Sequence, residues 1–194
     1  MNRKGFTIVE MLIVLAITAL LSTLAIVYTH VGQNQISLSI EESKVAQLIL
    51  QARELSIATY STNAATCAYG VSFNYAAQTY SLFAYNSAVN TGGRFICPSL
   101  ASTTAAIAAG SMAKYGGGSW QVHPANGVVL KDFGAGSSTI DDILFYPPDP
   151  FTLISTDGGS TFQSPTPTAY IYLGTADGAT TRIITINPAG QVSL

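Results

Sequence analysis

KGFTIVEMLIVLAITALLSTLAIVYTHV, residues 4–31, is the stretch that decides the fold of this chain. It is predominantly apolar, and between Phe6 and Ile40 the only Asp, Glu, Lys or Arg is Glu10. Because about 20 apolar residues suffice to cross a bilayer, residues 11–31 predict a membrane-spanning helix. A carboxylate in such a segment costs roughly 2 to 3 kcal/mol or more, which predicts a functional role with a positively charged partner.

The charges that flank this stretch predict its orientation. Arg3 and Lys4 precede it, and the next charges after Glu10 are Glu41 and Glu42. The positive-inside bias then keeps the N-terminus in the cytoplasm and places the rest of the chain outside. A cleavable secretory signal would have a shorter apolar core and a small-x-small cleavage site. A plain single-pass anchor, with the glutamate reaching the headgroups, is a further alternative.

Residues 4–10, Lys-Gly-Phe-Thr-Ile-Val-Glu, resemble the prepilin cleavage and methylation motif of type IV pilins and type II secretion pseudopilins. The resemblance implies that a prepilin peptidase cuts between Gly5 and Phe6 and methylates the new Phe6 amine. It also implies that Glu10 meets the terminal amine of an adjacent subunit during assembly. Other pilin or pseudopilin subunits, an inner-membrane assembly platform and, before assembly, membrane lipid are the expected partners.

Elementary physics supports the same pairing. Phe6 and Glu10 are four residues apart and share one face of a helix. An ammonium at Phe6 would neutralise Glu10 and remove most of the cost of burying either charge, although a buried pair is not automatically stabilising. The pair would fix the axial stagger between neighbouring helices.

The chain divides into a leader (1–5), a membrane and polymerisation half of the helix (6–31), an amphipathic half (32–60) and a β-rich head (61–194). We expect an α+β, pilin-like fold in which one long helix, membrane-spanning in its first half, packs on an antiparallel β-sheet head. In the amphipathic half the apolar residues follow the i, i+3, i+4 spacing, and Glu41, Glu42, Lys44 and Arg53 lie mostly off that face. The apolar positions are Val45, Leu48, Ile49, Ala52 and Leu55.

Two details of the helix differ from, or add to, the pilin pattern. Pilins often have a kinking proline in the apolar part, whereas this chain has Val27 near that position. Gly32 is a candidate bend because glycine weakens a helix by about 1 kcal/mol. The segment 52–58 also resembles the helix end of H-type minor pseudopilins.

The head reads as short strands separated by turns, which favours an antiparallel sheet on the helix. Two loop-rich stretches are expected at about 98–119 and 149–167, the second introduced by Pro147-Pro148. A turn is expected at 75–78 and another at 187–190. The expected strands are 69–74, 79–85, 128–130, 143–146, 169–173, 182–186 and 191–194.

Composition limits the chemistry. Only 9% of the residues are charged and the net charge is −2, which argues against a nucleic-acid partner because a basic stripe is missing. Cys67 and Cys97 are the only cysteines, and outside the membrane they are expected to form a disulfide, with two buried thiols as the alternative.

We expect neither an enzyme nor a cofactor. No Gly-x-Ser-x-Gly elbow is present, and His123 precedes a proline in a turn-like context. The scattered Cys and His residues do not predict a zinc site. Asp141-Asp142, Asp157-Gly158 and Asp177-Gly178 leave calcium open as a minor alternative, although Asp-Gly is first a turn signal.

The sequence therefore predicts a structural subunit of a type IV pilus or a type II secretion pseudopilus. The expected location is the cytoplasmic (inner) membrane and then an extracytoplasmic filament. The alternative is a minor pilin at a filament tip that serves as a recognition module in adhesion or DNA uptake.

Overall fold

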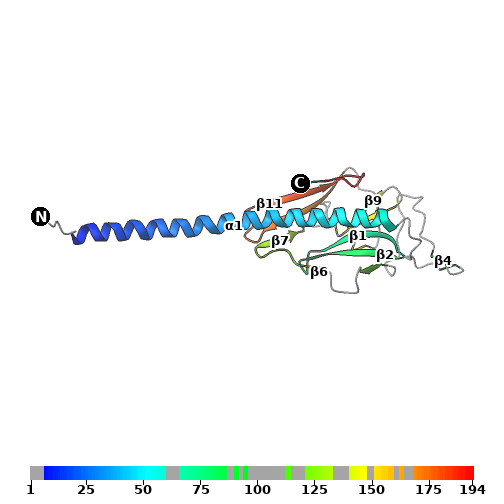
Figure 1. Ribbon diagram of the computed structural model, residues 1–194, viewed down its shortest axis with the longest axis horizontal. Coiled ribbons are helices and arrows are strands. Elements are labelled where there is room, and N and C mark those ends of the chain that lie inside the picture. The colour runs from blue at the N-terminus through cyan, green and yellow to red at the C-terminus, as the bar shows by residue number, and fades with distance from the viewer. Residues whose placement is uncertain are drawn as a thin grey trace.

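The apolar stretch and the amphipathic segment after it form one helix, α1 (Ile8–Thr59), of 52 residues in the computed structural model (Figure 1). At 1.5 Å per residue it is about 78 Å long, and it continues through Gly32 without a break. The prediction of one long helix is confirmed. The structure describes residues 7–59, 66–86, 90–91, 94–95, 112–114, 121–132, 140–147, 151–159, 162–163 and 168–194, without the side chains of 27–31, 90–91, 94–95 and 112–114.

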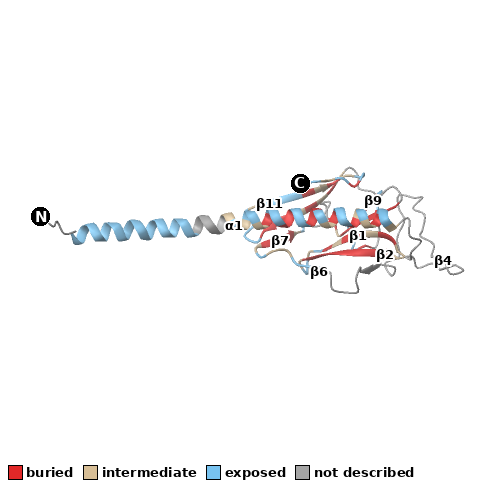
Figure 2. Ribbon diagram, viewed as in Figure 1, coloured by how far each residue is buried: buried red, intermediate tan, exposed pale blue. Residues whose placement is uncertain are grey.

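The first half of α1 stands clear of the head (Figure 2). Residues Ile8–Ile26 are long and apolar enough to cross a membrane, and none of that window is buried inside the protein. Ile8 is 82% exposed and Leu24 is 59% exposed. An apolar surface of this extent needs lipid or other helices to cover it, which agrees with the predicted membrane segment.

The second half of α1 lies against the head. Val45, Ile49 and Ala52 are completely buried, and Leu48 and Leu55 are partly buried against the same core, so the predicted apolar face is confirmed. The prediction that Glu41 and Glu42 lie off this face is wrong, because both are buried, at 0% and 7% exposure.

The head consists of antiparallel strands, as predicted (Figure 1). Their bounds are β1 (Thr66–Asn74), β2 (Thr79–Asn86), β3 (Asn90–Thr91), β4 (Arg94–Phe95), β5 (Met112–Lys114), β6 (Gln121–Val122), β7 (Val128–Lys131), β8 (Asp142–Tyr146), β9 (Phe151–Ser155), β10 (Ala169–Thr175), β11 (Thr181–Ile186) and β12 (Val192–Ser193).

These strands form two main sheets rather than the single sheet that we expected. A six-stranded sheet has the order β5-β2-β1-β8-β9, with β6 also paired to β2, and a four-stranded sheet has the order β12-β11-β10-β7. Strands β3 and β4 form a separate pair. Helix α1 contacts β1 and β8 of the first sheet and β7, β10, β11 and β12 of the second. One helix face therefore packs on two sheets.

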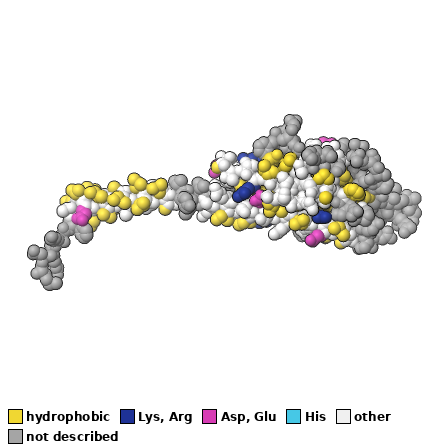
Figure 3. Space-filling view, turned by 90° about the horizontal axis from the view of Figure 1, so that it is seen from above, with side chains coloured by type: hydrophobic (Ala, Val, Ile, Leu, Met, Phe, Trp, Pro, Cys, Tyr) yellow, Lys and Arg dark blue, Asp and Glu magenta, His cyan; other side chains and the backbone are white. Residues whose placement is uncertain are grey.

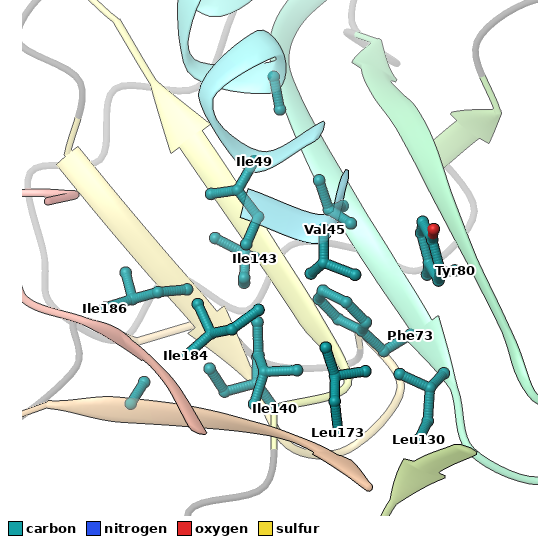
Figure 4. Packing of buried hydrophobic residues seen from close by; sticks show 14 of the residues in the cluster. Val45, Ile49, Phe73, Tyr80, Leu130, Ile140, Ile143, Leu173, Ile184 and Ile186 are labelled. Atoms are coloured by element: carbon teal, nitrogen blue, oxygen red, sulfur yellow. The ribbon is translucent and has the colours of Figure 1, made fainter. Parts of the chain in front are cut away.

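The strand registers place the core between α1 and the two sheets. Val71 lies opposite Ile143 in the first sheet, and Ile171 lies opposite Ile184 in the second, all with 0% exposure. Figure 4 shows Val45 and Ile49 of the helix above side chains from both sheets, including Ile143 and Ile184. Burial of these aliphatic side chains, each worth about 1.5 to 3 kcal/mol, holds the head to the helix.

The predicted loop at 149–167 is wrong in part. Strand β9 (Phe151–Ser155) lies within it and pairs with β8, so that Leu144 faces Leu153. Pro147-Pro148 suggested a loop, but the run Phe-Thr-Leu-Ile-Ser that follows has the aromatic and β-branched residues of a strand. In the other expected loop, β5 pairs with β2, and residues 98–111 and 115–119 lie outside the described part of the chain.

Candidate assembly site on the N-terminal helix

The first turn of α1 has a hydrogen-bonded cap. The Glu10 N–H donates to Thr7 Oγ1 at 3.3 Å, and the Met11 N–H donates to the Thr7 carbonyl at 3.2 Å. Thr-Ile-Val-Glu has the Thr-x-x-Glu spacing of a capping box. An acidic side chain in the first turn also interacts favourably with the helix dipole. The predictions from the sequence did not include this local role for Thr7 and Glu10, although the Thr-x-x-Glu spacing is a local signal for a helix N-terminus.

The Glu10 side chain is exposed on the apolar half of the helix. Figure 3 shows hydrophobic side chains over the visible face of this half. Within the described residues, Glu10 has no ion-pair partner. Gly5 and Phe6 lie outside the described residues, so cleavage between them, methylation of Phe6 and pairing of Phe6 with Glu10 stay predictions.

Glu41, on the same helix, is in the opposite situation. Its side chain is fully buried and accepts a hydrogen bond from the Tyr80 hydroxyl at 2.5 Å. The Ala125 backbone N–H donates to Glu41 Oε2 at 3.3 Å, and Lys44 Nζ lies 3.3 Å from the same oxygen. Burial, followed by the hydrogen bond and charge of Glu41, raises the pKa of Tyr80.

These contacts tie three elements together at one carboxylate. The helix supplies Glu41 and Lys44, β2 supplies Tyr80, and the loop before β7 supplies Ala125. A buried carboxylate is tolerated only when it is hydrogen-bonded and paired. These contacts therefore fix the position of the head along the helix, and they involve only the second half of α1.

The other acidic residues that the structure describes do not form a metal site. Within the described ranges, no group of three or more His, Cys, Asp or Glu could hold a metal ion. Asp141 accepts a hydrogen bond from the Gly158 N–H at 3.0 Å, and Asp157 accepts one from the Ser155 hydroxyl at 2.6 Å. Burial, despite a hydrogen bond from Ser72, raises the pKa of Asp142 to about 6.

Cys67 is buried on the outer side of the six-stranded sheet, beside Phe83 and Leu144. It is disulfide-bonded. Its predicted partner Cys97 lies outside the described residues, so the pairing of Cys67 with Cys97 stays a prediction. His123 is exposed, with Nδ1 3.2 Å from the Gln78 carbonyl oxygen.

An apolar helix that is exposed over its first half, carries a glutamate in its first turn and holds an antiparallel β head on its second half defines a membrane-anchored α+β protein of the pilin-like kind. Residues 1–26 match the family model described as the prokaryotic N-terminal methylation motif. This is the prepilin motif of type IV pilins and pseudopilins, so the first 26 residues are similar to the N-terminus of proteins of that kind. Comparison with curated proteins and with solved structures found no match. The similarity of residues 52–58 to H-type pseudopilins stays a prediction.

Proposed function

We propose that this protein is a structural subunit of a type IV pilus or a type II secretion pseudopilus. Prepilin peptidase cuts between Gly5 and Phe6 and methylates the Phe6 amine, and the subunit then leaves the inner membrane through an assembly platform. The observation that supports this role is the wholly exposed apolar helix Ile8–Ile26 with Glu10 in its first turn. In the membrane the N-terminus faces the cytoplasm and the head lies outside.

Assembly would replace lipid around the first half of α1 with the same half of neighbouring subunits. Helices in lipid associate through close packing and polar contacts rather than through the hydrophobic effect, because lipid tails are as apolar as leucine. Glu10 has no ion-pair partner within the described residues. A polar contact of its side chain would therefore determine how neighbouring helices align. The Phe6 amine of a neighbour supplies the positive charge that a carboxylate in hydrocarbon requires.

Helix capping is the competing explanation for the Glu10 side chain. Thr7 Oγ1 accepts the Glu10 backbone N–H, and a glutamate at this spacing can complete the capping box by accepting the Thr7 N–H. The two roles respond differently to substitution. Glutamine serves in a capping box as well as glutamate does, because the side chain still accepts a hydrogen bond. It carries no charge, so it cannot neutralise an ammonium.

The test compares Glu10→Gln and Glu10→Ala with the wild-type chain in a host that assembles it. We expect both variants to be cleaved normally and to keep a folded head, and both to be depleted at least tenfold from sheared filaments. Glu54→Gln, an equal change of charge at an exposed position on the second half of α1, should assemble normally. Normal incorporation of Glu10→Gln together with loss of Glu10→Ala would assign the glutamate to helix capping and overturn the pairing.

A further inference from the structure

A cleft lies where α1 enters the head, lined by both apolar and hydrogen-bonding groups. It has a volume of about 490 Å³, and its lining comes from the helix and from the loop before β7. The lining residues are Gln33, Asn34, Ile36, Ser37, Asn126 and Gly127. The polar side chains among these described lining residues are amides and a hydroxyl, and the described lining includes no Lys, Arg or aromatic residue.

The wall of the cleft is built by two turns that meet at Asn34. The Ala176 N–H donates to the Gly127 carbonyl at 2.8 Å, which joins the loop before β7 to the β10–β11 turn. Gly127 has a φ of +85°, and a side chain there would lie 3.2 Å from Asn34 Oδ1. Glycine at this position therefore allows both the turn and the close approach of the helix.

Asp177, on the β10–β11 turn, adds a negative charge beside the cleft. Hydrogen bonds lower its pKa, first from the Thr175 hydroxyl and then from the Ala179 backbone N–H, with a smaller contribution from the Asn34 side chain. The carboxylate is exposed and stays ionised at neutral pH. Asp177 is not one of the lining residues, but its hydrogen bond with the lining residue Asn34 places the carboxylate at the edge of the cleft. A ligand that fills the cleft and extends an ammonium group to this edge would meet neutral hydrogen-bonding groups and one anion.

The height of the cleft along the helix indicates where such a ligand would come from. Gln33 follows Ile26, the last residue of the membrane-length segment, by about 10 Å along the helix axis. It follows the end of the apolar stretch at Val31 by only about 3 Å. The headgroup layer extends roughly 5 to 8 Å from the edge of the hydrocarbon. With the hydrocarbon edge at Val31, the end of the apolar stretch, the cleft opens at the level of the headgroups.

We propose that this cleft binds the headgroup of phosphatidylethanolamine in the outer leaflet of the inner membrane while the subunit waits for assembly. The primary ammonium pairs with Asp177, and the phosphate accepts hydrogen bonds from the amides of Gln33 and Asn126 and from the Ser37 hydroxyl. Among the described residues the lining has no Lys or Arg, which disfavours a purely anionic headgroup. The described lining also has no aromatic residue, which disfavours choline, whose quaternary ammonium cannot donate a hydrogen bond. The inference rests on membrane residence of the helix and not on the contact of Glu10.

Native mass spectrometry of the full chain in detergent micelles tests this inference. The chain is equilibrated with equal amounts of phosphatidylethanolamine, phosphatidylcholine and phosphatidylglycerol that have the same acyl chains. We expect about fivefold more retained phosphatidylethanolamine than either competitor. Asp177→Asn, which keeps an oxygen for the Ala179 N–H, and Asn34→Ala should each abolish the preference, whereas the control Glu54→Gln should keep it.

Three outcomes would overturn the inference. These are equal retention of the three lipids, preference for phosphatidylcholine or phosphatidylglycerol, and a preference that survives either Asp177→Asn or Asn34→Ala. The melting temperature of each variant shows that its head is folded. Failure of the lipid preference would leave filament incorporation intact, and failure of the Glu10 test would leave the lipid preference intact, so the two proposals can fail separately.

Discussion

Helix α1 carries two glutamates whose surroundings are opposite. Glu10 lies on the exposed apolar half and has no ion-pair partner within the described residues. Glu41 lies on the half that packs on the head, is completely buried, and contacts Tyr80, Ala125 and Lys44. Glu41 thus stabilises the fold through contacts within the chain, whereas Glu10 has no ion-pair partner within the described residues.

This difference shows how one helix can both pack on the head and present a surface to lipid or to neighbouring subunits. The second half satisfies its carboxylate within its own chain and so belongs to the head. The first half leaves both its apolar surface and its carboxylate for lipid or for neighbouring subunits. Substitutions should therefore separate cleanly into those that unfold the head and those that affect only the membrane and filament state.

Glu41→Ala should have the largest effect on stability. It leaves the Tyr80 hydroxyl and the Ala125 N–H unpaired in a buried site, so we expect the head to lose about 3 to 4 kcal/mol. Denaturant unfolding of the full chain in micelles measures the loss. Glu10→Ala should change head stability by less than about 0.5 kcal/mol. Equal losses from the two substitutions would mean that the two halves are not independent.

Ile49→Ala tests the same division with an apolar side chain. Ile49 is fully buried, and its truncation should cost about 3 kcal/mol through lost burial and a cavity. Leu15→Ala, at a position that is 65% exposed, should leave the melting temperature of the head unchanged. A comparable drop in melting temperature for Leu15→Ala would contradict the division.

pH should act on the head through Asp142. Because its pKa rises to about 6 from 3.8 on folding, the folded head binds this proton more tightly than the unfolded chain does. The resulting stabilisation is fully present below about pH 4 and is lost as the pH rises through 6, by up to about 3 kcal/mol. Asp142→Asn should raise the melting temperature at pH 7.5 and flatten its dependence between pH 4.5 and 7.5. A variant with the wild-type pH profile would exclude Asp142 as the source.

Thr7→Val should have the smallest effect. It removes the oxygen that accepts the Glu10 N–H and should cost about 1 kcal/mol, confined to the first turn of the helix. Amide hydrogen exchange of residues 8–11 in micelles reports this loss, and Thr7→Ser, which keeps the hydroxyl, is the matched control. Faster exchange within the head would show that the two halves of α1 are coupled.

The sequence predicted those features that local patterns determine. The 3.6-residue spacing of Val45, Ile49 and Ala52 indicated the buried face, and alternation in the head indicated most of the strands. The same spacing puts Glu41, four residues before Val45, on the buried face. Its hydrogen-bond partners could not be predicted, because Tyr80 is 39 residues away and Ala125 is 84 residues away. The division into two sheets likewise depends on pairings between distant strands, which periodicity does not specify.

The site was predictable to a different degree. Glu10 was conspicuous because it is the only charge in an apolar run, and the motif around it indicated processing. The Thr7 cap has a local signature, the Thr-x-x-Glu spacing, that went unused. The cleft at Asn34 and Gly127 had no sequence signature, since it arises where the helix meets two turns from distant parts of the chain.

The pairing of Glu10 with a neighbouring Phe6 amine is tested most directly by solid-state NMR on mixed-label filaments. One pool of subunits carries ¹³C-labelled glutamate and the other carries ¹⁵N-labelled phenylalanine, so that any contact between the labels joins different chains. The account predicts a cross-peak between the Glu10 carboxylate carbon and the Phe6 amine nitrogen in the mixed filaments. Its absence there, with the same cross-peak present in filaments whose subunits each carry both labels, would place the pair within one chain and contradict the account.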